Sequence, residues 1–159
     1  MVKRTSLEDA ECPIARSLDA IGDWWSLLII RDALLGARRF GEFQKSLGLA
    51  KNILTVRLRT LVDQDILKMA PASDGSAYQD YVLTPKGHGI FPILVALRQW
   101  TEAFDEHPDG IATILVDRAR GKPVQKLALV SQDGRVLDAA DTTLKPRPAA
   151  KRARRRASA

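Results

Sequence analysis

The stretch FGEFQKSLGLAKNILTVRLRTLVDQ, residues 40–64, decides the fold. Apolar residues recur in it three and four positions apart on both sides of a glycine: Phe40, Phe43 and Leu47 before it, Leu54, Leu58 and Leu61 after it. Gly48 permits a tight turn, so the pattern predicts helices over about residues 40–47 and 51–64, joined by residues 48–50. Two short helices that flank such a turn form a helix-turn-helix.

The second helix of this pair is the one expected to enter the DNA major groove, by its N-terminal end. With the three leucines facing inward, its outward positions are Lys51, Asn52, Thr55, Val56 and Arg59. Asn52 can pair with adenine, and Arg59 with guanine or a phosphate. Thr55 and Val56 offer small contacts, including contacts to a thymine methyl, and Lys51 lies where a phosphate is expected.

Two further helices are predicted before this pair. One covers about residues 8–20, and Gly22 ends it. The other runs over about residues 23–35, with Asp23 as its N-cap and Gly36 as its stop. The second is apolar around much of its circumference, which indicates burial on more than one side.

A β-hairpin and a long helix are predicted after the pair. Strands at residues 67–70 and 78–83 surround Asp74-Gly75-Ser76, and Asp-Gly between short apolar runs is a strong hairpin signal. Thr84 and Pro85 then suit the N-cap and first position of a helix that reaches about Phe104. The order predicts a mainly α fold with a small β-wing, a winged helix-turn-helix, over residues 1–107.

The remainder of the chain has a different pattern. Short strands are expected at residues 114–116, 126–130 and 135–137, with a hairpin turn at Asp133-Gly134. A piece of this size, residues 108–144, is too small for an independent core. Residues 145–159 are expected to be a disordered basic tail.

The distribution of charge matters more than the formal net charge of +6. Seven basic residues and no acidic residue lie in the tail, so the rest of the chain is close to neutral. Residues 31–68 nevertheless carry eight basic and four acidic side chains, the local excess that phosphate binding requires. Arg38 and Arg39, just before the third helix, are candidates for clamping the DNA backbone. Arg57 is either a DNA contact or an intramolecular ion-pair partner.

Other classes of protein find little support in the sequence. Cys12 is the single cysteine, which excludes an internal disulfide and a cysteine-rich zinc site. Only His88 and His107 are present, in no metal or nucleophile spacing, and no glycine-rich phosphate loop occurs. We therefore expect no catalysis, no cofactor and no metal. The apolar runs are too short for a membrane span, and we expect a soluble, cytoplasmic protein without a membrane partner.

Taken together, the residues resemble the HxlR family of bacterial winged-helix regulators over residues 12–100. The resemblance rests on Cys12-Pro13-Ile14, Leu18, Ile21-Gly22, Trp25, Leu28, Ile30-Arg31, Leu34, Gly36, Arg38-Arg39-Phe40, Glu42-Phe43, Leu54 to Leu58, Leu61, Tyr81, Leu83-Thr84, Gly87 and Leu97 to Trp100. It implies a homodimer, formed by the N-terminal and long C-terminal helices, that binds palindromic double-stranded DNA as a repressor or an activator.

The resemblance also makes Cys12 a candidate redox sensor, because some members sense oxidants, quinones or aldehydes through a cysteine at this place. Such sensing needs an accessible thiolate. The alternative is that Cys12 is a small buried residue of the dimer interface. A further small-molecule effector is compatible with the family, but the sequence does not identify one.

The chain departs from the family pattern in two places. Its wing, residues 70–78, lacks a basic residue near the tip, which leaves Ser76 and Gln79 as polar candidates. In some relatives the C-terminal extension carries paired cysteines that suggest a zinc-ribbon-like unit, and no thiol remains here, so no zinc is expected.

Two other functions compete with the regulator: a winged helix used only for protein contacts, and nonspecific DNA binding driven by the tail. Steep loss of DNA affinity with salt would exclude the first. Specific binding that survives removal of the tail would exclude the second.

Overall fold

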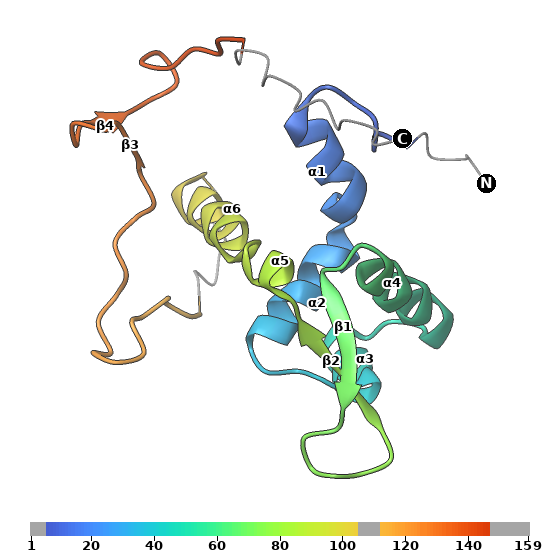
Figure 1. Ribbon diagram of the computed structural model, residues 1–159. Coiled ribbons are helices and arrows are strands. Elements are labelled where there is room, and N and C mark those ends of the chain that lie inside the picture. The colour runs from blue at the N-terminus through green and yellow to red at the C-terminus, as the bar shows by residue number, and fades with distance from the viewer. Residues whose placement is uncertain (1–5, 105–111, 147–159) are drawn as a thin grey trace, which may run out of the picture. The chain divides into compact units, whose positions relative to one another are not determined.

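The structure is a computed structural model that describes residues 6–104 and 112–146. The chain divides into two compact units, with the boundary between Thr113 and Ile114. The elements of the first unit are α1 (Pro13–Ile21), α2 (Trp24–Leu34), α3 (Phe40–Leu47), α4 (Lys51–Asp63), β1 (Leu67–Pro71), β2 (Gln79–Leu83), α5 (Pro85–His88) and α6 (Phe91–Phe104). This mainly helical order with a two-stranded wing confirms the predicted winged helix-turn-helix (Figure 1).

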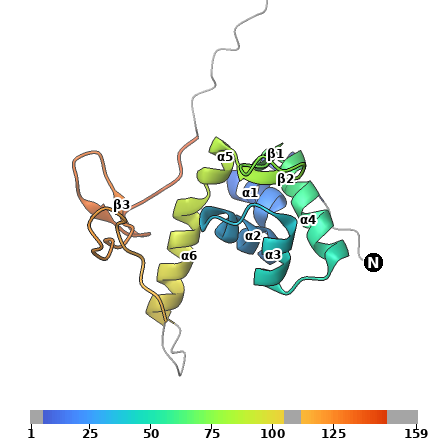
Figure 2. The ribbon, with the colours of Figure 1, turned by 90° about the horizontal axis from the view of Figure 1, so that it is seen from below.

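Helix α2 is the centre of the first unit. It packs against α1, α3, α4, α6 and β2, and α4 and α6 lie on opposite sides of it in both ribbon views (Figures 1 and 2). Ile29 and Ile30 are fully buried. These neighbours explain why the helix is apolar around most of its circumference. Asp23 caps it as predicted, because its carboxylate accepts a hydrogen bond from the Ser26 N–H at 3.1 Å.

The first helix starts later than predicted. Helix α1 begins at Pro13 and not at residue 8, and Cys12 before it is extended, with φ −70° and ψ 119°. A residue that precedes proline is disfavoured in the helical region, so Pro13 sets the N-terminus. The segment before it is held by the Asp19 carboxylate, which accepts from the Leu7 N–H at 3.0 Å.

The wing is an antiparallel hairpin, but the connection between its strands is longer than the two-residue turn that an Asp-Gly pair can form. The register runs from Leu67 opposite Leu83 to Pro71 opposite Gln79, and residues 72–78 connect the strands. Gly75 turns the chain with φ +73°, as its position in the predicted turn requires.

The predicted long helix after the wing is broken. Thr84 caps a short α5, accepting from the Gly87 N–H at 3.1 Å, but a turn at residues 89–90 separates α5 from α6. Pro92 is the second residue of α6 and has no N–H to continue the preceding helix, which suits a new N-terminus. Gly87 also fixes α5, since a Cβ there would lie 2.3 Å from the Ile66 carbonyl oxygen.

The second unit has less sheet than predicted. Its described residues, 114–146, hold one short hairpin, β3 (Leu129–Val130) and β4 (Val136–Leu137), turned at Gly134 with φ +88°. Of the predicted strand at residues 114–116, only Val116 makes an isolated bridge, to Pro123. The tail from residue 147 and the predicted boundary at residues 107–108 lie outside the described residues.

None of the helices in the described ranges has the length and apolar character needed to cross a bilayer.

Candidate nucleic-acid interface

The turn between α3 and α4 is fixed by a glycine and a buried leucine. Gly48 ends α3 in the left-handed conformation, with φ +63° and ψ +21°, which favours a residue without a Cβ. Leu49 is buried, and its carbonyl accepts from the Gln44 side chain at 3.3 Å. The angle between the two helices is therefore set by packing and a side-chain hydrogen bond.

Helix α4 separates its side chains into a core face and a free face. Leu54, Leu58 and Leu61 have no exposed surface, and with Phe43 of α3 they join the hydrophobic core of the first unit. The helix therefore cannot rotate about its axis without exposing three leucines, at about 1.5 to 3 kcal/mol for each. This packing determines which residues face away from the protein.

All five residues predicted to read DNA lie on that free face and are exposed: Lys51, Asn52, Thr55, Val56 and Arg59. The Arg59 side chain is 83% exposed, and within the described residues its one ion pair is a long contact of 4.0 Å to Asp63. Thr55 is exposed, and it donates its hydroxyl hydrogen to the Lys51 carbonyl of its own helix at 2.8 Å. The structure thus brings these five together on one surface.

Besides the loose, exposed Arg59–Asp63 pair, three basic residues of the 31–68 segment form closer ion pairs within the chain. Arg31 pairs with Asp32 at 2.8 Å, and Arg57 with Asp23 at 3.0 Å. The third is Arg39, which pairs with wing carboxylates. Arg57 thus has the intramolecular partner that the sequence left as one of two alternatives.

Arg38 and Arg39, predicted together as backbone clamps, have different surroundings. Both donate their backbone N–H to the Glu42 carboxylate, at 2.7 Å and 2.9 Å, and these bonds lower the pKa of Glu42. The Arg38 side chain is exposed, and within the described residues it has no ion pair. The Arg39 guanidinium, in contrast, is turned toward the wing.

Arg39, Asp74, Ser76 and Asp80 form a polar group that we call the wing cluster, in which the wing candidate Ser76 is half-buried. Its hydroxyl accepts from Arg39 Nη2 at 3.2 Å, and its backbone N–H donates to Asp74 at 3.0 Å. Hydrogen bonds from the Ser76 hydroxyl and N–H, followed by the bond from Arg39, lower the pKa of Asp74 to about 2. Sequence reasoning missed Tyr78, which is 70% exposed beside this cluster; the signal was an aromatic residue next to an Asp-Gly turn.

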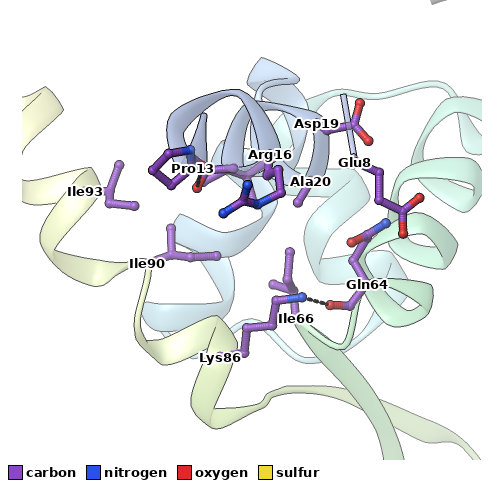
Figure 3. Close-up of a pocket in the computed structure, with 12 residues that line it drawn as sticks. Glu8, Pro13, Arg16, Asp19, Ala20, Gln64, Ile66, Lys86, Ile90 and Ile93 are labelled. Atoms are coloured by element: carbon purple, nitrogen blue, oxygen red, sulfur yellow. Dashed lines mark hydrogen bonds between the residues drawn. The ribbon is translucent and has the colours of Figure 1, made fainter. Parts of the chain in front are cut away.

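Cys12 lies at the other end of the unit, as the exposed N-cap residue of α1. Helix α1 borders a pocket of about 450 Å³, whose apolar lining includes Ile66, Ile90 and Ile93 (Figure 3). Arg16 and Lys86 project into this pocket, but both are hydrogen-bonded within the chain. Arg16 donates to the backbone carbonyls of residues 10 and 11, and Lys86 donates to the backbone carbonyl of Gln64.

Comparison with known families agrees with this geometry. Residues 20–109 match the model of the HxlR-like helix-turn-helix family, which is more than half of the chain. The chain belongs to this family. The HxlR-like match covers every residue nominated above for DNA contact, and Cys12 precedes it.

Relatives and solved structures place the chain among transcription regulators. It is 31% identical over 135 residues, 85% of each chain, to the "Uncharacterized HTH-type transcriptional regulator Rv3095" of Mycobacterium tuberculosis. The crystal structure of "PA1607, a Putative Transcription Factor" matches with a TM-score of 0.83 and 53% identity, over 89% of this chain and 99% of the other. The oxidised form of the "Redox regulator HypR" matches with a TM-score of 0.54 and 27% identity, over 60% of this chain and all of the other. This chain is therefore an HxlR-like transcription regulator with a helix-turn-helix fold.

Proposed function

We propose that this regulator reads a palindromic operator as a homodimer, with α4 of each protomer in a major groove. The observation that carries the proposal is the outer face of α4, where two base-reading side chains, Asn52 and Arg59, stand exposed above a fixed core. Lys51 at the N-terminus of the helix and Arg38 before α3, which form no ion pair among the residues that the structure describes, supply cations for phosphates.

The homodimer is supported by apolar side chains that a single chain leaves in water. On α1, Ile14 is 69% and Leu18 is 50% exposed. On α6, Trp100 is 64% and Phe104 is 76% exposed, and their rings contact each other. Exposed apolar side chains grouped on two helices favour an interaction site there. A two-fold dimer would bury both helices and place two copies of α4 on successive half-sites.

The role proposed for Cys12 is redox sensing. Its exposure suits reaction with an oxidant or electrophile, and the similarity to a redox regulator favours it. As the chain has a single cysteine, a protein disulfide would have to join two chains.

The test is selection of bound sequences from a random pool of duplex DNA, with the full chain and with residues 145–159 deleted. We expect a dyad-symmetric motif from both proteins, and affinity for it that falls steeply with salt. Reading by α4 would be contradicted if the selected DNA contained no common motif, or if the motif disappeared when residues 145–159 were deleted.

A further inference from the structure

Two adjacent arginines before α3 differ in what their side chains can do. Arg38 is exposed, while Arg39 is 32% exposed and has its guanidinium turned toward the wing. Both are close to the N-terminus of α3, so sequence position alone does not distinguish them. Their partners within the chain do.

The Arg39 guanidinium holds the wing through four contacts. Its Nη2 lies 2.7 Å from the Asp74 carboxylate and 3.2 Å from the Ser76 hydroxyl. Its Nε lies 3.4 Å from Asp80, and its central carbon lies 5.5 Å from the centre of the Tyr78 ring. One side chain at the start of α3 therefore contacts three residues of the 72–78 connection and Asp80 of β2.

Asp80 makes this contact necessary. Asp80 is only 2% exposed. One of its carboxylate oxygens accepts hydrogen bonds from the Ser73 N–H and hydroxyl, both at 3.2 Å. The other carboxylate oxygen accepts no hydrogen bond, and the Arg39 guanidinium is its ion-pair partner. A buried carboxylate without a cation is strongly unfavourable. Arg39 thus cannot leave Asp80 for a phosphate without a large cost.

We propose that Arg39 is a positioning residue for the wing, which it holds so that Tyr78 contacts DNA, while Arg38 makes the phosphate contact. The proposal rests on the proposed function. No Lys or Arg occurs between Met69 and Pro85, so the wing contact is an uncharged one. Tyr78 has an exposed phenol that can donate to a phosphate or sugar oxygen, and its ring lies on the Arg39 guanidinium.

The experiment compares Arg39→Lys with Arg38→Lys, which form a matched pair, and measures operator affinity as a function of salt. Lysine keeps the charge but not the planar fork. We expect Arg38→Lys to bind like the wild type, and Arg39→Lys to lose about tenfold in affinity with an unchanged salt slope. If Arg39→Lys binds like the wild type, charge alone matters at this position and the proposal is overturned.

A double-mutant cycle tests the link to Tyr78. We expect Tyr78→Ala to weaken operator binding, and Arg39→Lys to add nothing further in its presence. The proposal would be overturned if the affinity losses of the two variants were fully additive, or if Tyr78→Ala bound the operator like the wild type. Either result would leave the proposed function intact, provided that the wild type binds its operator specifically. If Arg39→Lys does not fold, Arg39→Gln combined with Asp80→Asn replaces it, because this pair leaves no unpaired charge at the buried Asp80 position. The same loss and the same cycle are then expected.

Discussion

The Arg57 guanidinium of α4 lies 3.0 Å from the Asp23 carboxylate, which also caps the N-terminus of α2. One carboxylate therefore joins the proposed reading helix to the central helix of the fold. The pair is partly exposed, with 34% of the Arg57 and 21% of the Asp23 side-chain surface accessible, so its own contribution to stability is small. The cap is the larger of the two effects.

The two roles of Asp23 are separable by substitution. Asp23→Ala removes both the cap and the ion pair, and we expect the free energy of unfolding to fall by about 1 kcal/mol. Asp23→Ser keeps a capping oxygen without the charge and should recover most of that loss in denaturant unfolding. Equal destabilisation by the two variants would show that the ion pair dominates.

The exposed face of α4 makes a prediction about sequence preference. Asn52→Ala and Arg59→Ala should each cost about 1 to 3 kcal/mol at the operator and relax preference at one base position. Competition binding against single-base operator variants measures this. Arg135→Ala is the control, because Arg135 is an exposed arginine of the second unit and should not affect preference. Unchanged affinity in both α4 variants would mean that another surface reads the DNA.

The apolar surface of α6 predicts the oligomeric state. Trp100→Glu places a charge in the proposed dimer interface, so we expect a monomer in light scattering and weak operator binding. Val136→Glu, at a residue that is 70% exposed in the second unit, should leave the dimer unchanged. A Trp100→Glu protein that remains a dimer would show that the interface lies elsewhere.

The exposed thiol of Cys12 predicts a redox response. Peroxide converts two thiols to a disulfide and water, so the wild type should form covalently linked pairs of chains on a non-reducing gel and lose operator affinity. Cys12→Ser should bind the operator but not respond. Addition of a reductant to the oxidised wild type should restore binding. Release of Cys12→Ser from DNA by peroxide would rule out the thiol as the sensor.

Sequence reasoning predicted the helix-turn-helix well because its signals are local. The three leucines of α4 and Gly48 between the helices determine both the elements and the side chains that face outward. The two errors in helix bounds came from prolines that were given too little weight. Pro13 delays α1, and Pro92 divides the predicted last helix, since each is better placed in a first turn than inside a helix.

The partners of Arg39 could not be predicted in this way. Asp74 and Asp80 lie 35 and 41 positions further along the chain, and no periodic pattern links them to it. Their meeting depends on how the wing folds back to the start of α3, where the Tyr81 N–H donates to the Arg38 carbonyl at 2.7 Å. Charge and position made Arg39 a candidate for the DNA backbone, but they could not show that its guanidinium pairs with wing carboxylates.

The hydrogen bonds around Asp74 predict a pH dependence confined to acid. Its pKa in the folded chain is about 2, below the ordinary value of 3.8, so the carboxylate stabilises the wing above pH 4 and this stabilisation is lost as the pH falls toward 2. Since the Ser76 hydroxyl is the largest cause, Ser76→Ala should raise the pKa of Asp74, whereas Ser76→Thr, which keeps a hydroxyl, should not. Carboxyl NMR titration measures the shift directly. An Asp74 pKa near 3.8 in the wild type would show that the wing cluster does not form in solution.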